Sequence, residues 1–408
     1  MRRWIVLVGV LLVAAHSLAP RSCLGEEEGP THFGLLEAFV DFRATQELGI
    51  QWVRGHIMWD DMAQRGPDGA FAWDIFDDDV RGVQLHGFEI LGMFIPFAPW
   101  DQEKCHAGER MLGPPCDIDG YSRFVGATVE RYDGDGIEDM PGLRYPILYW
   151  EVFNEPAMKD LPPFYDFTPQ DYFELLRATY EEVKAACAQC QVVQGGVAGI
   201  APDKEQFLRS YLALGGGQYF DIASIHFIHS GAFDTFNVEP FKRTLQDYGI
   251  DKPIWVTEVQ IESGPGADYP YLTDEAAAAL LVKGYVRAFA LGADKLFYVV
   301  LKPTPKFPPN VVVSSLINTH GDKRTTYFAM ETMIEKLGSF AGVEELDSGL
   351  FKFETPQGPV YVVWNCSRLP EEEFEGKVLL TDILGETRTM LVQDVTVGDT
   401  PVFLESVP

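Results

Sequence analysis

From about residue 36 to residue 337, the chain alternates between segments with helical spacing of apolar residues and short apolar runs bounded by turn residues. The predicted strands lie at 51–57, 89–96, 147–153, 192–196, 220–226, 253–259 and 295–301, after a weak first strand near 32–35. The predicted helices lie at 36–48, 73–87, 119–132, 168–186, 203–214, 238–248, 273–291 and 324–337. Eight such units over about 310 residues match an α/β fold of the (β/α)8 TIM barrel type better than a doubly wound sheet.

After Gly338 the pattern changes to short strands separated by Gly and Pro turns. The predicted strands lie at 350–354, 359–364, 377–381 and 388–392. We therefore expect a barrel domain over 31–338 and a small C-terminal β-sandwich-like accessory domain over 339–408. As an alternative arrangement, the first strand of the mature chain joins this second sheet.

The N-terminus has the form of a secretory signal peptide. Arg2 and Arg3 form a basic start, and the apolar stretch 5–15 is short for a membrane span. Cleavage after Gly25 would remove residues 1–25 and leave a secreted or periplasmic protein. The alternatives are an uncleaved anchor and lipid attachment at Cys23.

The remaining cysteines fit an exported chain. One pair brackets a loop rich in Gly and Pro, and the other ends a predicted helix. Two local disulfides are therefore predicted, with Cys366 left as a free thiol. The pairs are Cys105 with Cys116 and Cys187 with Cys190. A zinc site that uses these cysteines and His106 is the alternative, although their spacing does not repeat as in paired CxxC motifs.

The formal net charge of −29 disfavours nucleic acid and anionic membrane surfaces as partners. No segment after the signal peptide is apolar enough to cross a bilayer, so no stable membrane insertion is expected. No cofactor is required by any motif.

One acidic turn, with Asp133, Asp135 and Asp139 separated by glycines, is a candidate structural calcium site, and a solvated acidic turn is the alternative.

Polar side chains stand where several predicted strands end. The second strand ends in Arg54 and His56, the fourth in Asn154 and Glu155, the sixth in His226, and the seventh in Glu258. In a barrel these strand ends meet on one face, which is where such folds carry their active sites. Strands four and seven face one another across the barrel, so Glu155 and Glu258 are expected to converge.

Asn154, Glu155 and Pro156 after an apolar strand, together with 255–258 (Trp-Val-Thr-Glu), resemble clan A of the glycoside hydrolases. The segment 53–56 (Val-Arg-Gly-His) followed by 59–61 (Trp-Asp-Asp) is similar to the second strand of family 39, which contains β-xylosidases and α-L-iduronidases. The resemblance implies a retaining enzyme, with Glu155 as general acid/base and Glu258 as nucleophile. Retention requires carboxyl groups about 5–5.5 Å apart.

The same resemblance suggests roles for neighbouring residues. Arg54 would keep the nucleophile ionised, Asn154 would bond the sugar 2-hydroxyl, and His56 and His226 would bond other hydroxyls. The candidate sugar platforms are Trp59, Trp100 and Tyr298. For each group a purely structural role is the alternative: a buried ion pair for Arg54, a structural histidine, or a core aromatic. Strand alternation also places Glu151 on the face of Glu155, as a deeper network partner.

The sequence departs from the clan in two places. The His-x-Tyr pattern after the sixth strand is absent, since Phe227 and Ile228 follow His226, and His229 or Tyr298 is the candidate substitute. The eighth strand offers Tyr298 and Lys302 where relatives often have a Trp. These differences leave the sugar open.

The predicted function is that of an exported retaining glycoside hydrolase acting on an oligosaccharide or polysaccharide. Two alternatives stay open at this point. One is a transglycosylase, in which an acceptor sugar replaces water, and the other is a non-catalytic carbohydrate-binding protein on the same barrel.

Overall fold

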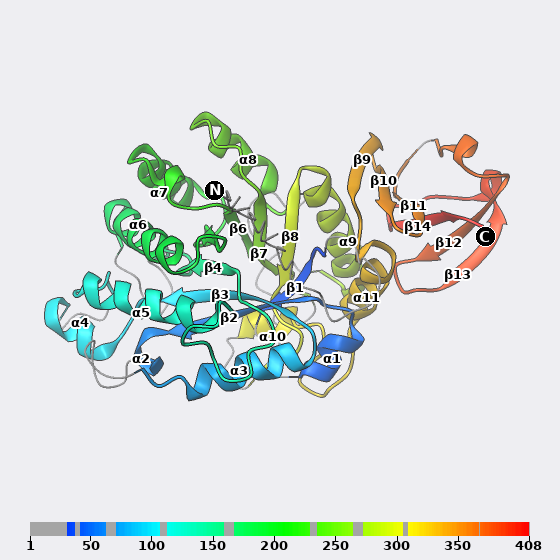
Figure 1. The fold of residues 1–408 in the computed structure, drawn as a ribbon. Coiled ribbons are helices and arrows are strands. Elements are labelled where there is room, and N and C mark those ends of the chain that lie inside the picture. The colour runs from blue at the N-terminus through cyan, green and yellow to red at the C-terminus, as the bar shows by residue number, and fades with distance from the viewer. Residues whose placement is uncertain are drawn as a thin grey trace, which may run out of the picture.

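A computed structural model describes residues 31–36, 41–62, 71–106, 112–158, 167–228, 235–263, 272–304, 309–366 and 368–407 (Figure 1). The predicted signal peptide 1–25 and the candidate His229 lie outside these residues.

Eight parallel strands form one sheet in the order β5-β4-β3-β2-β1-β8-β7-β6. Bridges between Val193 and Ile222 and between Val197 and Ile225 join the two end strands, β5 and β6, so the sheet comes close to full closure. The predicted (β/α)8 barrel is therefore confirmed. The strands are β1 (Phe33–Leu36), β2 (Trp52–Met58), β3 (Glu89–Ile95), β4 (Tyr149–Val152), β5 (Gln191–Gln194), β6 (Ala223–Ile228), β7 (Ile254–Gln260) and β8 (Ala293–Tyr298).

Helices surround this sheet, as Figure 1 shows. They are α1 (Phe42–Glu47), α2 (Trp59–Met62), α3 (Asp74–Leu85), α4 (Pro99–Cys105), α5 (Ile118–Tyr132), α6 (Pro169–Ala186), α7 (Pro202–Ala213), α8 (Val238–Asp247), α9 (Asp274–Ala290), α10 (Pro309–Ser314) and α11 (Thr325–Leu337). The short helices α2, α4 and α10 follow β2, β3 and β8 and were not predicted.

Local sequence explains where the long helices begin. At α6 the Thr168 hydroxyl accepts a bond from the backbone N–H of Asp171, and the Asp171 carboxylate accepts one from the backbone N–H of Thr168. Pro169 occupies the first helical position, where no N–H is needed. This reciprocal cap stabilises the start of a helix by satisfying its free donors.

The strands are buried on both faces because side chains fill the barrel on one side and helices cover the other. All seven residues of β7 are buried, including Thr257, Glu258 and Gln260. Polar groups at such positions need partners inside the barrel, and those partners form the candidate site.

The C-terminal residues form one antiparallel sheet in the order β13-β12-β14-β11-β10-β9. Its strands are β9 (Gly342–Asp347), β10 (Leu350–Thr355), β11 (Gly358–Val363), β12 (Lys377–Asp382), β13 (Thr387–Leu391) and β14 (Val402–Ser406), with short 3-10 turns at Glu371–Glu373 and Val392–Asp394. The predicted β-domain is confirmed, and β9 and β14 are additions to it. Thr31 joins this region only by an isolated bridge to Ser339, while β1 belongs to the barrel.

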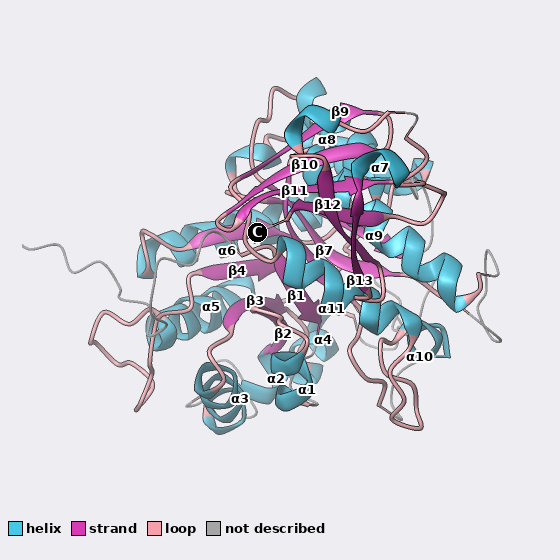
Figure 2. Cartoon of the chain, turned by 90° about the vertical axis from the view of Figure 1, so that its right-hand side faces the viewer, coloured by secondary structure: helices cyan, strands magenta, loops and turns pink. Residues whose placement is uncertain are grey.

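This sheet lies beside α9 and α11 (Figures 1 and 2). One face joins the barrel's hydrophobic core through Phe351, Phe353, Val362, Trp364 and Phe403. The other face has a smaller core of its own, built from Leu350, Tyr361, Val363, Phe374, Val378, Leu380, Val392 and Leu404. Both faces of the sheet are thus covered, one by the barrel and the other by side chains of the C-terminal residues themselves.

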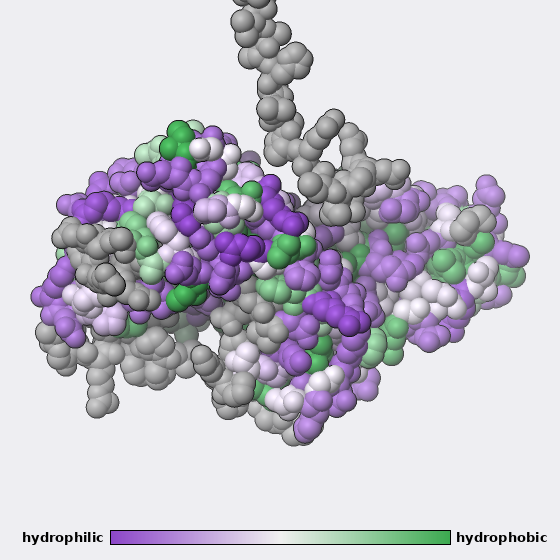
Figure 3. Space-filling model, turned by 60° about the horizontal axis from the view of Figure 1, so that its bottom comes forward, coloured by the Kyte–Doolittle hydropathy of each residue, from purple (hydrophilic) through white to green (hydrophobic). Residues whose placement is uncertain are grey.

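Hydrophilic residues predominate on the face of the molecule shown in Figure 3, and apolar residues form small separate areas there. Among the helices that the structure describes, none has both the length and the apolar composition needed to span a bilayer.

Candidate active site

Arg54 lies inside the barrel and has no exposed surface. Its Nε donates to Glu151 Oε2 at 2.5 Å, its Nη1 to Glu258 Oε1 at 2.7 Å, and its Nη2 to Asn154 Oδ1 at 2.9 Å. The Arg54 guanidinium, on β2, is therefore hydrogen-bonded to β4, to the turn after β4, and to β7. The planar fork of an arginine suits such a multiple contact, which a lysine could not reproduce.

Glu151 is fully buried, and protein groups contact both of its oxygens. While Oε2 accepts from Arg54, Oε1 accepts from the Thr257 hydroxyl at 3.1 Å and from the backbone N–H of Gly196 at 3.2 Å. The interpretation of Glu151 as a deeper network partner is therefore confirmed by its contacts.

A β-bulge in β7 brings Thr257 into this network. Ile225 of β6 pairs with Val256, but the next residue, His226, pairs with Glu258, so Thr257 is the extra residue. A bulge re-aims side chains that would otherwise alternate between the two faces of a sheet. Thr257 was not among the predicted site residues, because simple alternation gives adjacent residues opposite directions.

The two glutamates come together at His226. His226 Nδ1 lies 2.7 Å from Glu155 Oε1 and 3.8 Å from Glu258 Oε2. One carboxylate oxygen of Glu155 and one of Glu258 lie within 4.8 Å of each other. This close approach is compatible with the carboxyl spacing of about 5–5.5 Å in retaining glycosidases.

The turn after β4 presents Glu155 through an uncommon backbone conformation. Phe153 and Glu155 both have positive φ, 68° and 47°, which non-glycine residues rarely adopt. The carbonyl of Glu155 accepts a bond from the N–H of Met158 at 2.9 Å, which closes the turn. Such conformations persist where the surrounding structure holds them, often at functional sites.

The electrostatic surroundings of Glu155 and Glu258 differ. Burial opposes ionisation of Glu258, but His226 and then Arg54 outweigh it and hold the pKa of this carboxyl below its ordinary value. For His226, burial favours the neutral ring, while Glu258 and Glu155 together raise its pKa above the usual range. Glu258 is therefore stabilised as an anion, whereas Glu155 makes its short contact with a histidine.

Among the other predicted sugar ligands, His56 lies near the end of β2, is partly buried, and contributes, after His226 and Arg54, to the lowered pKa of Glu258. Asn154 is partly buried and holds Arg54 through Oδ1. Trp100, on α4, is partly exposed and lies edge-on to Trp59 with ring centroids 4.8 Å apart. These three residues keep some solvent contact and remain candidates for sugar binding.

Trp59 and Tyr298 differ from the prediction. Both are fully buried, so neither presents a ring face to a sugar. Trp59 packs against Tyr121 and Phe124 as well as Trp100. The Tyr298 hydroxyl donates to the carbonyl of Ser314 at 2.7 Å, not to Glu258, so it does not replace the tyrosine of the clan. In this structure both rings are core residues.

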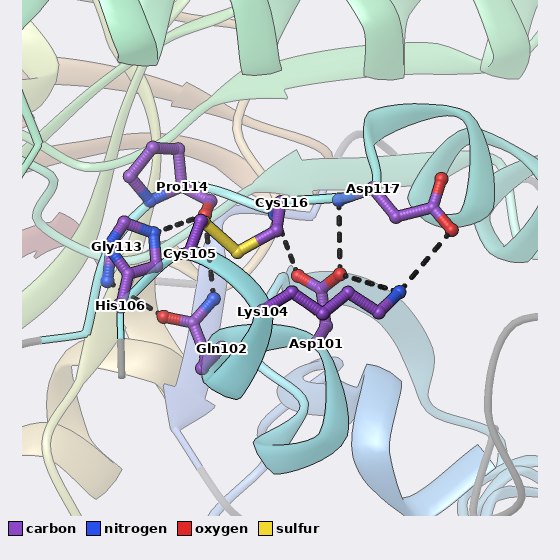
Figure 4. The surroundings of a disulfide bond; sticks show 9 residues. All are labelled: Asp101, Gln102, Lys104, Cys105, His106, Gly113, Pro114, Cys116 and Asp117. Carbon is purple, nitrogen blue, oxygen red and sulfur yellow. Dashed lines mark hydrogen bonds and ion pairs between the residues drawn. A yellow bond between two sulfur atoms is a disulfide. The ribbon is translucent and has the colours of Figure 1, made fainter. Parts of the chain in front are cut away.

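The two predicted disulfides are present, and Cys366 is free. Figure 4 shows the Cys105–Cys116 bond beside Asp101, whose carboxylate accepts from the backbone N–H groups of Cys116 and Asp117. The alternative zinc site is wrong, because sulfurs joined in a disulfide cannot act as thiolate ligands.

The acidic turn brings oxygens of Asp133, Asp135 and Asp139 within 4.8 Å of one another. Backbone N–H groups of Gly134 and Gly136 donate to the Asp139 carboxylate. Burial, followed by the nearby acids, raises the pKa of Asp133 to about 6, although a bond from the N–H of Asp135 acts in the opposite direction. Calcium binding at this turn stays a prediction.

A (β/α)8 barrel with a glutamate at the end of strand four and another on strand seven has the architecture expected of clan A glycoside hydrolases. The fold is similar to that of a family 39 glycoside hydrolase from Bacteroides cellulosilyticus WH2, with a TM-score of 0.69 and 17% identity over 92% of this chain and 81% of the other. It is also similar to a family 39 β-xylosidase from Caulobacter crescentus, with a TM-score of 0.62 and 16% identity over 92% of this chain and 96% of the other.

A family 30 subfamily 8 xylanase from Clostridium acetobutylicum has a TM-score of 0.58 and 14% identity over 92% of this chain and 94% of the other. No protein-family model matches the chain, and no curated protein matches it in sequence. At these identities the similarity concerns the fold, and at that level the predicted resemblance to family 39 and its clan is confirmed.

Proposed function

We propose that the protein is an exported retaining glycoside hydrolase, with Glu155 as general acid/base and Glu258 as nucleophile. The observation that carries the proposal is the pair of carboxylates within 4.8 Å of each other, of which Arg54 contacts only Glu258. A nucleophile must be ionised, and His226 and Arg54 favour that form of Glu258 over the opposing effect of burial.

In the first step, Glu155 gives its proton to the glycosidic oxygen while a Glu258 oxygen attacks the anomeric carbon. The bond to the leaving sugar breaks, and an ester between Glu258 and the sugar forms. Arg54 holds Oε1 of Glu258, and Oε2 lies 3.8 Å from His226 Nδ1, so Oε2 is the oxygen we assign to the attack.

In the second step, Glu155 is a carboxylate and takes a proton from water. The water oxygen attacks the anomeric carbon from the face that the leaving group left, and the ester bond to Glu258 breaks. Two inversions at the same carbon give overall retention, and both glutamates return to their starting protonation states.

The substrate is proposed to be a β-xyloside, because the structural neighbours include a β-xylosidase and xylanases. Export is supported by the two disulfides, since such bonds persist in oxidising compartments. N-terminal sequencing of the protein recovered from the medium or periplasm tests the export proposal, with a start at Glu26 as the expected result.

A panel of aryl xylosides, galactosides and glucosides, followed by polysaccharides, tests the activity. NMR of the first product should show the anomeric configuration of the substrate. Glu155→Ala should keep activity on substrates with good leaving groups and lose it on those with poor ones, while Glu258→Ala should lose both.

Added azide should distinguish the two roles. Azide in the site of Glu155→Ala should give a glycosyl azide of retained configuration, and in Glu258→Ala one of inverted configuration. Near-wild-type turnover of a poor substrate by either variant would refute the assignment. Oligosaccharide binding without cleavage across the whole panel would favour a carbohydrate-binding protein, and products extended by an acceptor sugar would favour a transglycosylase.

A further inference from the structure

The hydroxyl of Thr257 has three polar partners inside the barrel. Its Oγ1 lies 3.1 Å from Glu151 Oε1, 3.0 Å from His226 Nε2 and 2.5 Å from Ser224 Oγ. All four side chains are fully buried. Because a buried polar atom without a partner is costly, the hydrogens of this group must be arranged to satisfy every contact at once.

Only one arrangement does so. Glu151 is ion-paired with Arg54, and a carboxylate can only accept, so the single hydrogen of Thr257 points to Glu151. The Thr257 oxygen then has two lone pairs left, and these accept from the Ser224 hydroxyl and from His226 Nε2. His226 therefore carries a hydrogen on Nε2.

The hydrogen on Nε2 limits how Nδ1 of the same ring can bond to Glu155. Nδ1 lies 2.7 Å from Glu155 Oε1, a hydrogen-bond distance that requires one proton between the two atoms. Either Glu155 is a carboxylic acid that donates to Nδ1, or the ring is an imidazolium that donates to Glu155. If that proton is lost, the lone pair of Nδ1 faces a carboxylate. The ring cannot turn its other hydrogen toward Glu155 without leaving Thr257.

We propose that Thr257 and Glu151 are positioning residues that keep the hydrogen of neutral His226 on Nε2, so that His226 and Glu155 share a single proton and retain it to higher pH. This proposal rests on the proposed function only in taking Glu155 as the acid. When the shared proton is transferred to the leaving oxygen, no proton remains between His226 Nδ1 and Glu155. Glu155 then faces a lone pair, which makes it a stronger base toward water in the second step.

The other groups around His226 favour a proton shared between this ring and Glu155. Glu258 and Glu155 raise the pKa of the ring against the effect of burial, and Arg54 acts in the opposite direction. Asn237 Nδ2 donates to the backbone carbonyl of His226 at 2.9 Å. A Cβ at Gly196 would lie 1.9 Å from Nε2, so the absence of a side chain there is what admits the ring.

The first test reads the tautomer directly. Wild type, Thr257→Val and Thr257→Ser are labelled with ¹⁵N-histidine, and the imidazole nitrogens of His226 are followed from pH 5 to pH 9, with His226→Gln identifying the signals. In the neutral ring, wild type and Thr257→Ser should carry the hydrogen on Nε2, and Thr257→Val should carry it on Nδ1. This measurement needs no turnover, so it stands even if the protein cleaves no glycoside.

The second test uses the pH dependence of kcat/KM on the best aryl glycoside. In Thr257→Val, the deprotonated His226–Glu155 pair is stabilised, because the ring can donate from Nδ1 to the Glu155 carboxylate. The protonated pair is destabilised, because Nε2 loses the Thr257 hydroxyl as its acceptor. The basic limb should therefore move to lower pH by about one unit. Thr257→Ser keeps the hydroxyl and should restore the wild-type limb.

Thr257→Ala replaces Thr257→Val if the latter does not fold, and the same two readouts apply. The proposal is overturned if the hydroxyl-free variant keeps the Nε2 tautomer, or if its basic limb coincides with that of wild type. If wild type cleaves nothing on the panel, the proposed function fails, and the ¹⁵N result still decides the arrangement of hydrogens.

Discussion

Thr257 and Glu258 are adjacent in β7, yet both side chains point into the barrel. Thr257 reaches Glu151 on β4, and Glu258 reaches Arg54 on β2. The extra residue between the His226–Glu258 and Ile225–Val256 pairs makes this possible. A single bulge thus places the proposed nucleophile beside the hydroxyl that orients His226.

Removing the charge of Arg54 should destabilise the fold. Arg54→Met leaves Glu151 and Glu258 as buried carboxylates without their cation, which costs about 3–5 kcal/mol in comparable cases. In wild type, the lowered pKa of Glu258 contributes stability above its ordinary pKa, and this is lost as pH falls through the folded value. In Arg54→Met burial acts without Arg54 to offset it, so the stability deficit should shrink from pH 7 to pH 5.

Urea unfolding at the two pH values measures this deficit. Arg54→Lys is the matched control, because it keeps the charge but cannot form the same three bonds, and it should lose less stability than Arg54→Met. A deficit in Arg54→Met that is the same at pH 5 and pH 7 would contradict the explanation.

Much of the barrel could be predicted because its strands are short apolar runs separated by long amphipathic helices. The predicted strand 253–259 differs from β7 by one residue at each end, and the predicted helix 119–132 differs from α5 only at its start. The helix α2 has four residues, too few for a helical period to appear in the sequence. β9 was missed because four of its six residues are exposed and three of those four are charged, so it has no apolar alternation.

The candidate site was predictable where it depends on strand ends and not where it depends on packing. The parallel strands place Glu155, in the turn after β4, and Glu258, near the end of β7, at the same end of the barrel, while Arg54 lies within β2. The role of Thr257 depends on a bulge that alternation cannot show. Trp59 was predicted to be a sugar platform, but its burial is decided by α4 and α5, which contribute Trp100 and Tyr121.

A methyl group at Gly196 should disturb the site without touching either glutamate. In Gly196→Ala the new Cβ would lie 1.9 Å from His226 Nε2, so the ring must move away from Thr257. A displacement of about 1 Å in a catalytic group costs on the order of 100-fold in rate, and we expect a fall of that size in kcat. The comparison is Gly342→Ala, where nothing lies within 4 Å of the new Cβ and turnover should be unchanged. Equal turnover in the two variants would show that the ring position is unimportant.

The acidic turn should make stability depend on pH. Because the pKa of Asp133 is raised to about 6 from its ordinary value of 3.8, the folded chain binds this proton more tightly than the unfolded chain. Its contribution to stability should therefore fall as pH rises from about 4 to about 6 and stay constant above that. Asp133→Asn removes this dependence, so the Tm of the variant minus that of wild type should increase between pH 4 and pH 6.5.

Asp139→Asn provides the contrast for this measurement. Both oxygens of Asp139 accept backbone N–H bonds, so the variant loses one bond and should be less stable than wild type at every pH. The calcium prediction is checked with the same proteins at pH 7. If the turn binds calcium, added calcium chloride raises the Tm of wild type and raises that of Asp133→Asn less; no rise in wild type rejects the site.

The two disulfides should contribute unequally to stability. The cysteines are 11 residues apart in the Cys105–Cys116 bond and 3 apart in the Cys187–Cys190 bond. Loop closure in the unfolded chain gives about 3 kcal/mol for the longer loop and about 1.5 kcal/mol for the shorter. Replacing each pair by serines and measuring urea unfolding should reproduce this order. The reverse order would mean that native-state contacts, such as those of Asp101, outweigh loop closure.

The C-terminal sheet should be required for the barrel to fold. Phe351, Phe353 and Trp364 belong to the barrel's core, and the guanidinium of Arg287 on α9 lies 5.4 Å from the Trp364 ring. Lys336 on α11 is paired with Glu405 on β14 at 2.7 Å. A chain that ends at residue 338 would expose this apolar face, so we expect it to be insoluble.

Trp364→Ala tests the same contact in the full chain. Truncation of a buried aromatic costs about 3–5 kcal/mol, and the loss should appear in one cooperative transition of barrel and sheet together. The control is Leu391→Ala on the edge strand β13, where the side chain is 42% exposed and the change should stay within about 0.5 kcal/mol. If the chain ending at residue 338 instead folds with the Tm of the full protein, residues 339–408 are an independent accessory domain.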